Sequence, residues 1–216
     1  MRYAIFSDVH NHTKALAAMM HHAEAQRIDH YFCLGDVGID ECVNLVRQIE
    51  ALTVFGNWEV AGWRHLSPDN QRWVLKLPPL RKTNGFWLTH AAPLWPPHLD
   101  SLSTLNEKLR TIPMTRLFPY LHFESEALWN TIATLNEAGV PLIFHGHTHR
   151  QIVWRFTANN HLQKLMHACI AIRPGDTLVV GVGSVGRPED GPSPAYVIFD
   201  DDTQQIELVR ISTMIV

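Results

Sequence analysis

Histidine and acidic residues recur in this sequence in short motifs, each placed directly after a run of apolar residues. The chain holds 14 histidines among its 216 residues, and imidazole is the commonest metal ligand and the usual acid or base near neutral pH. Carboxylate and amide oxygens in the same motifs extend the set of metal-binding groups. These residue types predict a metal site. The candidate ligands are Asp8, His10, Asp36, Asn57, His90, His147 and His149.

The number and chemistry of these ligands point to a binuclear centre. Two carboxylates, one amide oxygen and four imidazoles are more than one tetrahedral ion can use, but they suit two ions that share a carboxylate. Two ions about 3.5–4 Å apart can clamp a phosphate group, lower the pKa of a bound water and stabilise charge on the attacking and leaving oxygens. The mixed nitrogen and oxygen donors fit Mn²⁺, Fe, Zn²⁺ or Ni²⁺ better than Mg²⁺ or Ca²⁺, and we expect Mn²⁺. Phosphoester hydrolysis is the reaction that follows.

The elements that position these motifs read as strands of a parallel sheet. Strands are predicted at residues 3–7, 30–34, 53–55, 85–89 and 141–144. Helices are predicted from apolar spacing at 13–26, 41–52 and 124–138, the last ended by Gly139. Alternation of strands and helices indicates a parallel βαβαβ start. Because open α/β sheets bind ligands beyond the carboxyl ends of their strands, we expect the motifs to meet at one place.

The second half of the chain has a different pattern. Short strands are predicted at residues 151–156, 177–182, 195–199 and 205–211. Turn chemistry at Asn159-Asn160 and at residues 200–202 separates them, as in an antiparallel meander. Residues 99–123 show no clear pattern. With no repeat and no linker, we expect one α/β domain over residues 1–216.

Composition excludes several classes of protein. Eighteen basic against 21 acidic residues give a net charge of −3, and no basic block provides a footprint for nucleic acid or an anionic membrane. Cys33, Cys42 and Cys169 are odd in number and lack CxxC spacing, which argues against a disulfide framework and a thiolate zinc site. No apolar run is long enough for a signal peptide or a membrane span. We expect a cytoplasmic protein whose partner is a small phosphorylated substrate, and the sequence leaves its oligomeric state open.

The ordered motifs D-x-H, G-D, G-N, H and G-H-x-H resemble those of the calcineurin-like metallophosphoesterases. The segments DECVNLVRQ (residues 40–48) and GSVGRPEDGPSPAYVIFD (183–200) look like the small bacterial branch of that family. The resemblance implies an αββα sandwich of two mixed sheets flanked by helices. It also implies that Asp36 bridges two ions. One ion would be held by Asp8, His10, Asp36 and His149, and the other by Asp36, Asn57, His90 and His147.

The third motif departs from the family pattern at the position of the general acid. Members with a defined proton donor have Gly-Asn-His followed by an acidic residue, whereas this chain has Trp58 and Glu59 after Asn57. An indole cannot protonate a leaving alkoxide, and general-acid catalysis contributes typically about 10²- to 10⁴-fold. We therefore name His12, which follows the ligand His10, as a candidate catalytic acid beside Asp36. The alternative is that His12 starts a helix or orients Asp8.

The substrate follows less directly from the residues. Phosphodiesters are weakly favoured, with phosphomonoesters and nucleotide phosphoanhydrides as alternatives. Asn57, Ser184 and Arg187 are candidate substrate contacts, with Ser184 and Arg187 expected at the pocket rim because a guanidinium can pair with phosphate in a bidentate fork. A surface turn at residues 183–187 is the competing interpretation. A metal-binding scaffold that has lost catalysis is the alternative from another class, and Trp58 is the feature that supports it.

Overall fold

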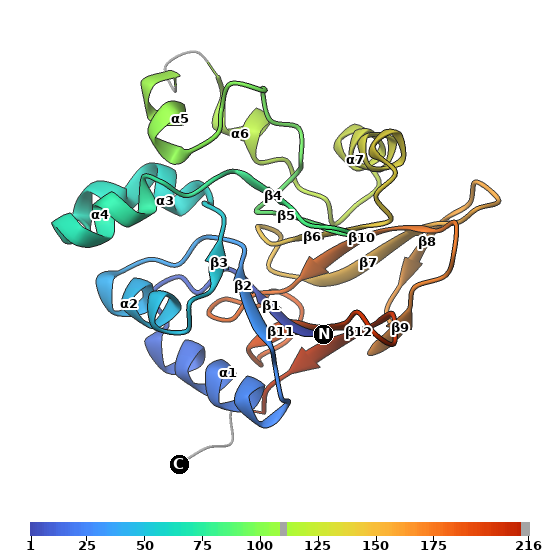
Figure 1. Cartoon of the computed structure of the whole chain (residues 1–216), viewed down its shortest axis with the longest axis horizontal. Coiled ribbons are helices and arrows are strands. Elements are labelled where there is room, and N and C mark those ends of the chain that lie inside the picture. The colour runs from blue at the N-terminus through green and yellow to red at the C-terminus, as the bar shows by residue number, and fades with distance from the viewer. Residues whose placement is uncertain (109–111, 213–216) are drawn as a thin grey trace.

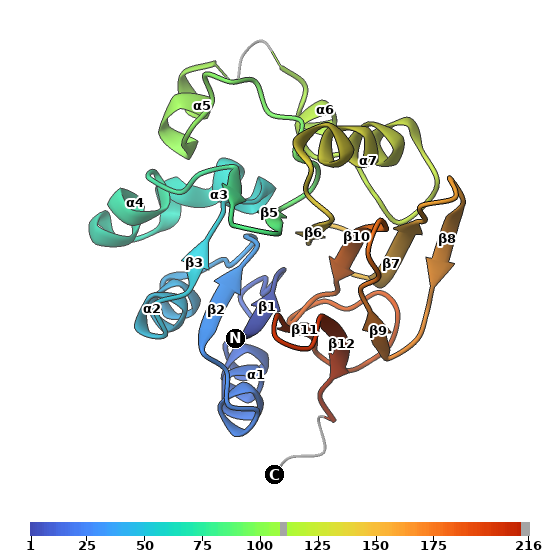
Figure 2. The same cartoon turned by 45° about the vertical axis from the view of Figure 1, so that its right-hand side comes forward.

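A computed structural model of the chain describes residues 1–108 and 112–212, and its two six-stranded sheets lie face to face between helices (Figures 1 and 2). The first sheet has the strand order β3 (Leu52–Thr53), β2 (His30–Cys33), β1 (Arg2–Phe6), β11 (Ala195–Asp200), β12 (Gln205–Arg210) and β9 (Cys169–Ala171). The second has the order β4 (Leu80–Lys82), β5 (Trp87–Thr89), β6 (Leu142–His145), β10 (Thr177–Val182), β7 (Gln151–Phe156) and β8 (Leu162–Leu165). The expected αββα sandwich is confirmed.

Both sheets are mixed, as expected. In the first, β1 pairs in parallel with β2 and β2 with β3, which confirms the βαβαβ start, while β11 is antiparallel to β1. In the second, β5, β6 and β10 are parallel and β7 is antiparallel to β10. The helices of the described residues are α1 (Thr13–Ala25), α2 (Asp40–Gln48), α3 (Asn57–Gly62), η1 (Trp63–His65), α4 (Pro68–Val74), α5 (Leu102–Lys108), α6 (Met114–Leu117) and α7 (Glu126–Ala138).

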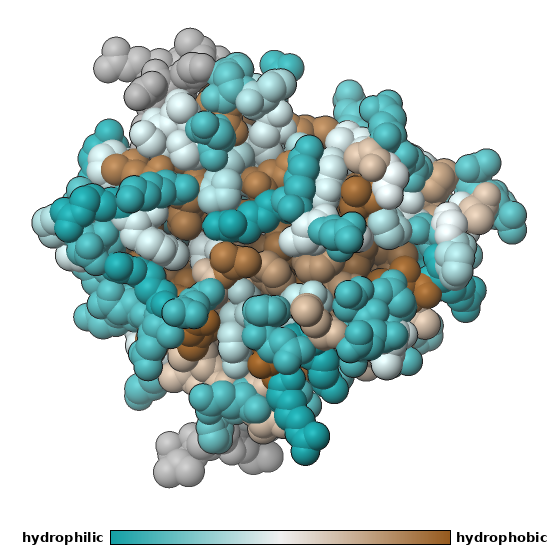
Figure 3. Space-filling model, in the orientation of Figure 1, coloured by the Kyte–Doolittle hydropathy of each residue, from teal (hydrophilic) through white to brown (hydrophobic). Residues whose placement is uncertain are grey.

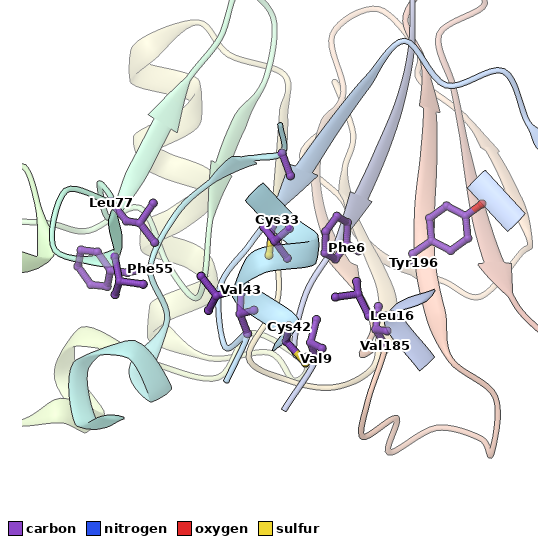
Figure 4. Close-up of a cluster of buried hydrophobic side chains, with 14 of the residues drawn as sticks. Phe6, Val9, Leu16, Cys33, Cys42, Val43, Phe55, Leu77, Val185 and Tyr196 are labelled. Carbon is purple, nitrogen blue, oxygen red and sulfur yellow. The ribbon is translucent and has the colours of Figure 1, made fainter. Parts of the chain in front are cut away.

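Three apolar layers hold the sandwich together. Along β1, Ala4 and Phe6 face the helices outside the first sheet, while Tyr3 and Ile5 face the second sheet. This alternation follows from the two-residue period of a strand. A third layer packs Ile143 and other residues of the second sheet against α7. Figure 4 shows the first layer, and Figure 3 shows apolar surface where the two sheets approach each other near the centre of that face.

The predicted single meander of the second half is wrong. Strands β7 and β10 pair with each other in the second sheet, whereas β11 and β12 form a hairpin in the first. The sequence pattern also missed β8 and β9 because their burial does not alternate over enough residues: only Ile170 is buried in β9. The chain therefore crosses between the sheets, and residues from both halves reach each sheet.

The ends of two helices can be explained from their capping residues and backbone angles. Helix α7 begins after Ser125, whose Oγ accepts a hydrogen bond from the Leu128 amide at 3.3 Å, and ends at Gly139 with φ 65°. Helix α2 ends earlier than predicted because Glu50 adopts a left-handed φ of 51°, although it is not a glycine. Residues 109–111, within the segment that shows no clear pattern, lie outside the described part of the chain.

Two predictions from composition can be compared with the structure. All three cysteines are free, with Cys33 and Cys42 buried and Cys169 exposed. None of the helices in the described residues combines the length and apolar character that a membrane span requires.

Candidate metal centre

The predicted ligands come together where five loops leave the carboxyl ends of parallel strands. The loops after β1, β2 and β3 belong to the first sheet, and those after β5 and β6 belong to the second. Within the described residues, two groups have ligand atoms close enough to hold a metal ion. One consists of Asp8, His10 and His149, and the other of Asp8, Asp36 and His90. The site therefore lies between the two sheets and takes residues from both.

On one side of the centre, two imidazoles face each other across a carboxylate. The Nε2 atoms of His10 and His149 are 2.9 Å apart, and Nε2 of His149 is 3.3 Å from Oδ1 of Asp8. Nε2 of His10 is also 3.7 Å from Oδ2 of Asp36. These four residues are the set expected to hold the first ion.

On the other side, the hydrogen bonding of His90 fixes which of its nitrogens carries a lone pair. Nδ1 of His90 donates to the carbonyl oxygen of Leu34 at 2.6 Å, so in the neutral ring Nε2 is an acceptor. This Nε2 lies 3.1 Å from Oδ1 of Asn57 and 3.5 Å from Oδ1 of Asp36. The His147 ring lies beside it, with ring centroids 5.2 Å apart. Asp36 thus turns one oxygen to each side of the centre.

The candidate ligands suit divalent metal ions because their hydrogen-bond acceptor atoms point toward one another. Nε2 of His90 meets two side-chain oxygens, and Oδ1 of Asp8 is buried without a hydrogen-bond donor among residues 1–108 and 112–212. Buried polar atoms in proteins normally have partners. A cation between these lone pairs would satisfy them together.

The pKa shifts of the buried candidate ligands also support a metal site. Burial opposes ionisation of Asp8, but the imidazoles of His10 and His149, whose Nε2 atoms lie 3.6 Å and 3.3 Å from its Oδ1, lower the pKa of this carboxyl below its usual range. Burial, together with the charges of Glu59 and Asp8, raises the pKa of Asp36 well above its usual range. Burial and the neighbouring His90 lower the pKa of His147 to about 3, which leaves this imidazole neutral and able to bind a metal. Bound cations would stabilise the ionised form of Asp36.

Five of the seven predicted ligands have a left-handed backbone. Their φ angles are 56° at Asp8, 49° at His10, 55° at Asp36, 63° at His147 and 55° at His149. Such conformations cost of order 1–3 kcal/mol each in residues other than glycine, and they cluster at functional sites. The loops are thus held in conformations that direct these side chains to one point.

Two glycines of the motifs lie so close to ligand side chains that no larger residue would fit. A Cβ at Gly56 would contact Oδ1 of Asp36 and lie 2.8 Å from Cε1 of His90. A Cβ at Gly146 would contact Oγ of Ser7 and lie 2.7 Å from Oδ2 of Asp8. Glycine in these motifs lets the backbone pass directly behind the ligands.

Glu59 is a functional residue that the sequence analysis did not single out. Its buried carboxylate accepts hydrogen bonds from the backbone amides of Asp36 at 2.8 Å, Val37 at 2.8 Å and Gly56 at 2.7 Å. It therefore ties the loop after β2 to the loop after β3. Its position three residues after Gly56, at the start of α3, was the available signal, because an acidic residue there can form a capping box.

Ser184 does not lie at the pocket rim, and that expectation is wrong. The side chain is fully buried, and its Oγ donates to the carbonyl oxygen of Asp8 at 2.7 Å and accepts from the Arg187 amide at 2.7 Å. A small hydroxyl in a tight turn satisfies backbone groups more readily than it reaches a ligand. Ser184 therefore supports the loop that carries Asp8.

Trp58 and Arg187 lie beside the candidate ligands, whereas His12 lies against the loop that contains Gly186. The exposed Arg187 holds its guanidinium carbon 5.1 Å from the Trp58 ring centroid, and that ring packs edge-on against His10 at 4.2 Å. His12 is the exposed N-cap residue of α1, and its Cδ2 would lie 2.9 Å from a Cβ at Gly186. Trp58 thus occupies the position next to the ligands where the family pattern has a histidine.

Comparison with known proteins identifies the family. A model of the calcineurin-like phosphoesterase superfamily domain matches residues 1–204. The chain belongs to this superfamily. The resemblance seen in the motifs is thereby confirmed, and the two mixed sheets with flanking helices are those of its structural neighbours.

Three individual proteins illustrate what the chain is similar to. A metallophosphoesterase of Sphaerobacter thermophilus is 25% identical, and the match covers 98% of this chain and 89% of that one with a TM-score of 0.73. An uncharacterised protein of Methanocaldococcus jannaschii is 28% identical over 96% of this chain and 86% of its own. A hypothetical protein of Pyrococcus horikoshii shares the fold at 11% identity with a TM-score of 0.63, over 97% of this chain and 87% of that one.

Proposed function

We propose that this protein is a phosphoesterase that depends on two divalent transition-metal ions and hydrolyses phosphodiesters in preference to monoesters and anhydrides. The observation that carries the proposal is the arrangement of lone pairs at the centre, where Nε2 of His90 faces the oxygens of Asn57 and Asp36. With Asp36 ionised, these three groups present lone pairs to one point, where a bound cation would stabilise the carboxylate and accept all three as ligands. We favour Mn²⁺, with Fe, Zn²⁺ and Ni²⁺ as alternatives.

The residues divide the work of hydrolysis between them. Bound ions would supply a water of lowered pKa and stabilise charge on the phosphoryl group. Asp8, His10, Asp36 and His149 would hold one ion, and Asp36, Asn57, His90 and His147 the other. The hydrogen bond from His90 to the Leu34 carbonyl keeps Nε2 free for this purpose. Arg187, which is exposed beside Trp58, would pair with phosphate oxygens.

The proposal is tested by metal analysis and turnover of the same purified protein. Protein stripped with chelator and reconstituted with Mn²⁺ should contain two ions per chain and hydrolyse bis(4-nitrophenyl) phosphate faster than 4-nitrophenyl phosphate. Loss of activity on chelation and its return with metal would support the proposal. Failure to hydrolyse either ester with two ions bound would instead favour a metal-binding scaffold, the function that Trp58 supports.

Arg187→Lys is expected to raise KM for the diester by about 10-fold with little change in kcat, because lysine keeps the charge but loses the bidentate fork. Steady-state kinetics measures both constants. Arg173→Lys, which changes an exposed arginine elsewhere on the surface, is the control and should behave like the wild type. Unchanged kinetics in Arg187→Lys would assign this arginine to the surface turn alone.

His12→Ala is expected to slow hydrolysis of esters with alkoxide leaving groups much more than that of 4-nitrophenyl esters, because only a poor leaving group needs a proton. The slowing should fall within the roughly 10²- to 10⁴-fold range of general-acid catalysis. Trp58→His should partly restore activity toward the alkyl esters by returning the family's donor to its position. Rates for matched alkyl and aryl diesters measure the effect. One common factor for all substrates would show that His12 only positions the loop of Asp8 and His10.

A further inference from the structure

A pocket opens beside the candidate metal centre, between the start of α2 and the helical segment α3–η1. Its volume is about 370 Å³. Figure 1 shows α2 and α3 on the same side of the molecule, with β3 running between them. The described residues that line the pocket include Ile39, Asp40, Glu41, Trp58, Gly62 and Trp63. The predicted metal ligands are not part of this lining, so the pocket is a separate compartment next to the centre.

Trp58 connects the pocket to the centre. Its side chain lines the pocket and also packs edge-on against the predicted ligand His10, with ring centroids 4.2 Å apart. Its backbone amide donates to Oδ1 of Asp36 at 2.8 Å. A molecule that fills the pocket therefore lies one aromatic ring away from a phosphate held at the centre.

The walls of the pocket suit a flat aromatic group. Two indoles, those of Trp58 and Trp63, line it together with Ile39, which is 41% exposed. At Gly62 the position of a Cβ has no protein atom within 4 Å, so this part of the lining opens into space. Stacking on tryptophan is favourable for any planar aromatic ring, including all nucleobases.

The carboxylates of the pocket favour hydrogen-bond donors. Its described lining residues include Asp40, Glu41 and Glu59 but no lysine or arginine. The nearby guanidiniums of Arg64 and Arg187 lie over the rings of Trp63 and Trp58 at 4.5 Å and 5.1 Å. The Asp40 carboxylate already accepts hydrogen bonds from Ser67 and Asn70, and that of Glu59 from three backbone amides, which leaves Glu41 as the carboxylate without a hydrogen-bond or ion-pair partner among the described residues. Exocyclic amino groups of a nucleobase would complement this carboxylate.

We propose that this pocket binds the amino-bearing nucleobase of a nucleotide-type substrate whose phosphoester lies at the metal centre. This inference rests on the proposed phosphoesterase function and names the class of substrate. Trp58 then has a positive role. It gives up the proton donor of the family pattern and provides a stacking surface for the base.

The test is the binding of adenosine, which has a base but no phosphate, to the full-length protein reconstituted with Mn²⁺. Isothermal titration calorimetry should show adenosine binding to the wild type, and adenosine should inhibit diester hydrolysis competitively. Gly62→Leu adds bulk to the pocket at a position where a Cβ has no protein atom within 4 Å, and it should weaken adenosine binding by about 10-fold or more. Ala61→Leu adds the same bulk at the exposed neighbouring residue and should bind adenosine like the wild type.

A comparison of adenosine with inosine tests the role of the Glu41 carboxylate. Inosine lacks the exocyclic amino group and should bind more weakly than adenosine, and Glu41→Gln should reduce this difference. Adenosine binding that is absent, or that Gly62→Leu leaves unchanged, would overturn the proposal even if the diester is hydrolysed. Adenosine binding that is lost in Gly62→Leu, in a protein that hydrolyses no phosphoester, would leave the base pocket standing and reject the phosphoesterase function.

Discussion

Replacing Asp36 with asparagine is expected to abolish phosphoesterase activity and to remove at least one of two bound ions. The Asp36 carboxylate turns Oδ1 toward His90 and Oδ2 toward His10, so both halves of the centre depend on it. Loss of an outer-shell partner of a metal ligand typically costs about 10- to 100-fold in affinity or activity, and loss of a shared ligand should exceed this. Elemental analysis of dialysed, Mn²⁺-reconstituted protein and its kcat/KM for bis(4-nitrophenyl) phosphate measure both effects.

Two further variants sharpen the interpretation of the Asp36→Asn result. His149→Ala removes an imidazole 3.3 Å from Oδ1 of Asp8 and should empty mainly the half of the centre that contains Asp8 and His10. Asp201→Asn changes an exposed aspartate and should retain both ions and full activity. A wild type that holds a single ion after reconstitution, together with an Asp36→Asn variant that holds the same amount, would contradict the binuclear centre.

Replacing Glu59 with alanine is expected to lower the free energy of unfolding by about 2–4 kcal/mol, because three buried backbone amides lose their acceptor at a cost of about 1–3 kcal/mol each, reduced by entering water. These amides belong to Asp36, Val37 and Gly56. Metal affinity should fall by about 10- to 100-fold as the loop of Asp36 loosens. Urea denaturation measures the stability, and metal titration measures the affinity.

The Glu59 prediction has matched controls in the same chain. Glu59→Gln keeps the shape and one acceptor oxygen, so its losses should lie between those of the wild type and those of Glu59→Ala. Glu137→Ala removes an exposed carboxylate on α7 and should change neither quantity. If Glu59→Ala unfolds like the wild type, the three amides find other acceptors and the two loops are held by other contacts.

The sequence could predict the ligands because their positions depend on local pattern. A polar residue directly after a buried strand must lie at the strand's carboxyl end, which is where Asp8 and Asp36 are found. Glu59 and Ser184 depend instead on which backbone groups a folded loop leaves unsatisfied. The sequence offered a capping-box position for Glu59 but could not show that its carboxylate also accepts from the amides of Asp36 and Val37, and it offered no signal for Ser184. Ser184 bonds to a residue 176 positions away.

The same distinction applies to the fold. The βαβαβ start was predictable because its strands and helices alternate with clear periods. The sheet that each later strand joins was not predictable, because β10 and β11 have nearly identical buried patterns and enter different sheets. The choice is made by pairing with β6 and β1, which are distant in the chain.

The distribution of the candidate ligands over both sheets has a consequence for how the molecule folds. Neither sheet carries a complete set: Asp8, His10, Asp36 and Asn57 follow strands of the first, and His90, His147 and His149 follow strands of the second. High-affinity binding therefore needs the sheets already docked. Metal ions would then bind only after the two sheets have packed together. They would stabilise the folded state by about 2.7 kcal/mol when the free ion concentration is 100-fold above the dissociation constant. In a cell that is short of the metal, the metal-free protein would unfold more readily. The protein would then have a shorter lifetime in addition to losing the proposed activity.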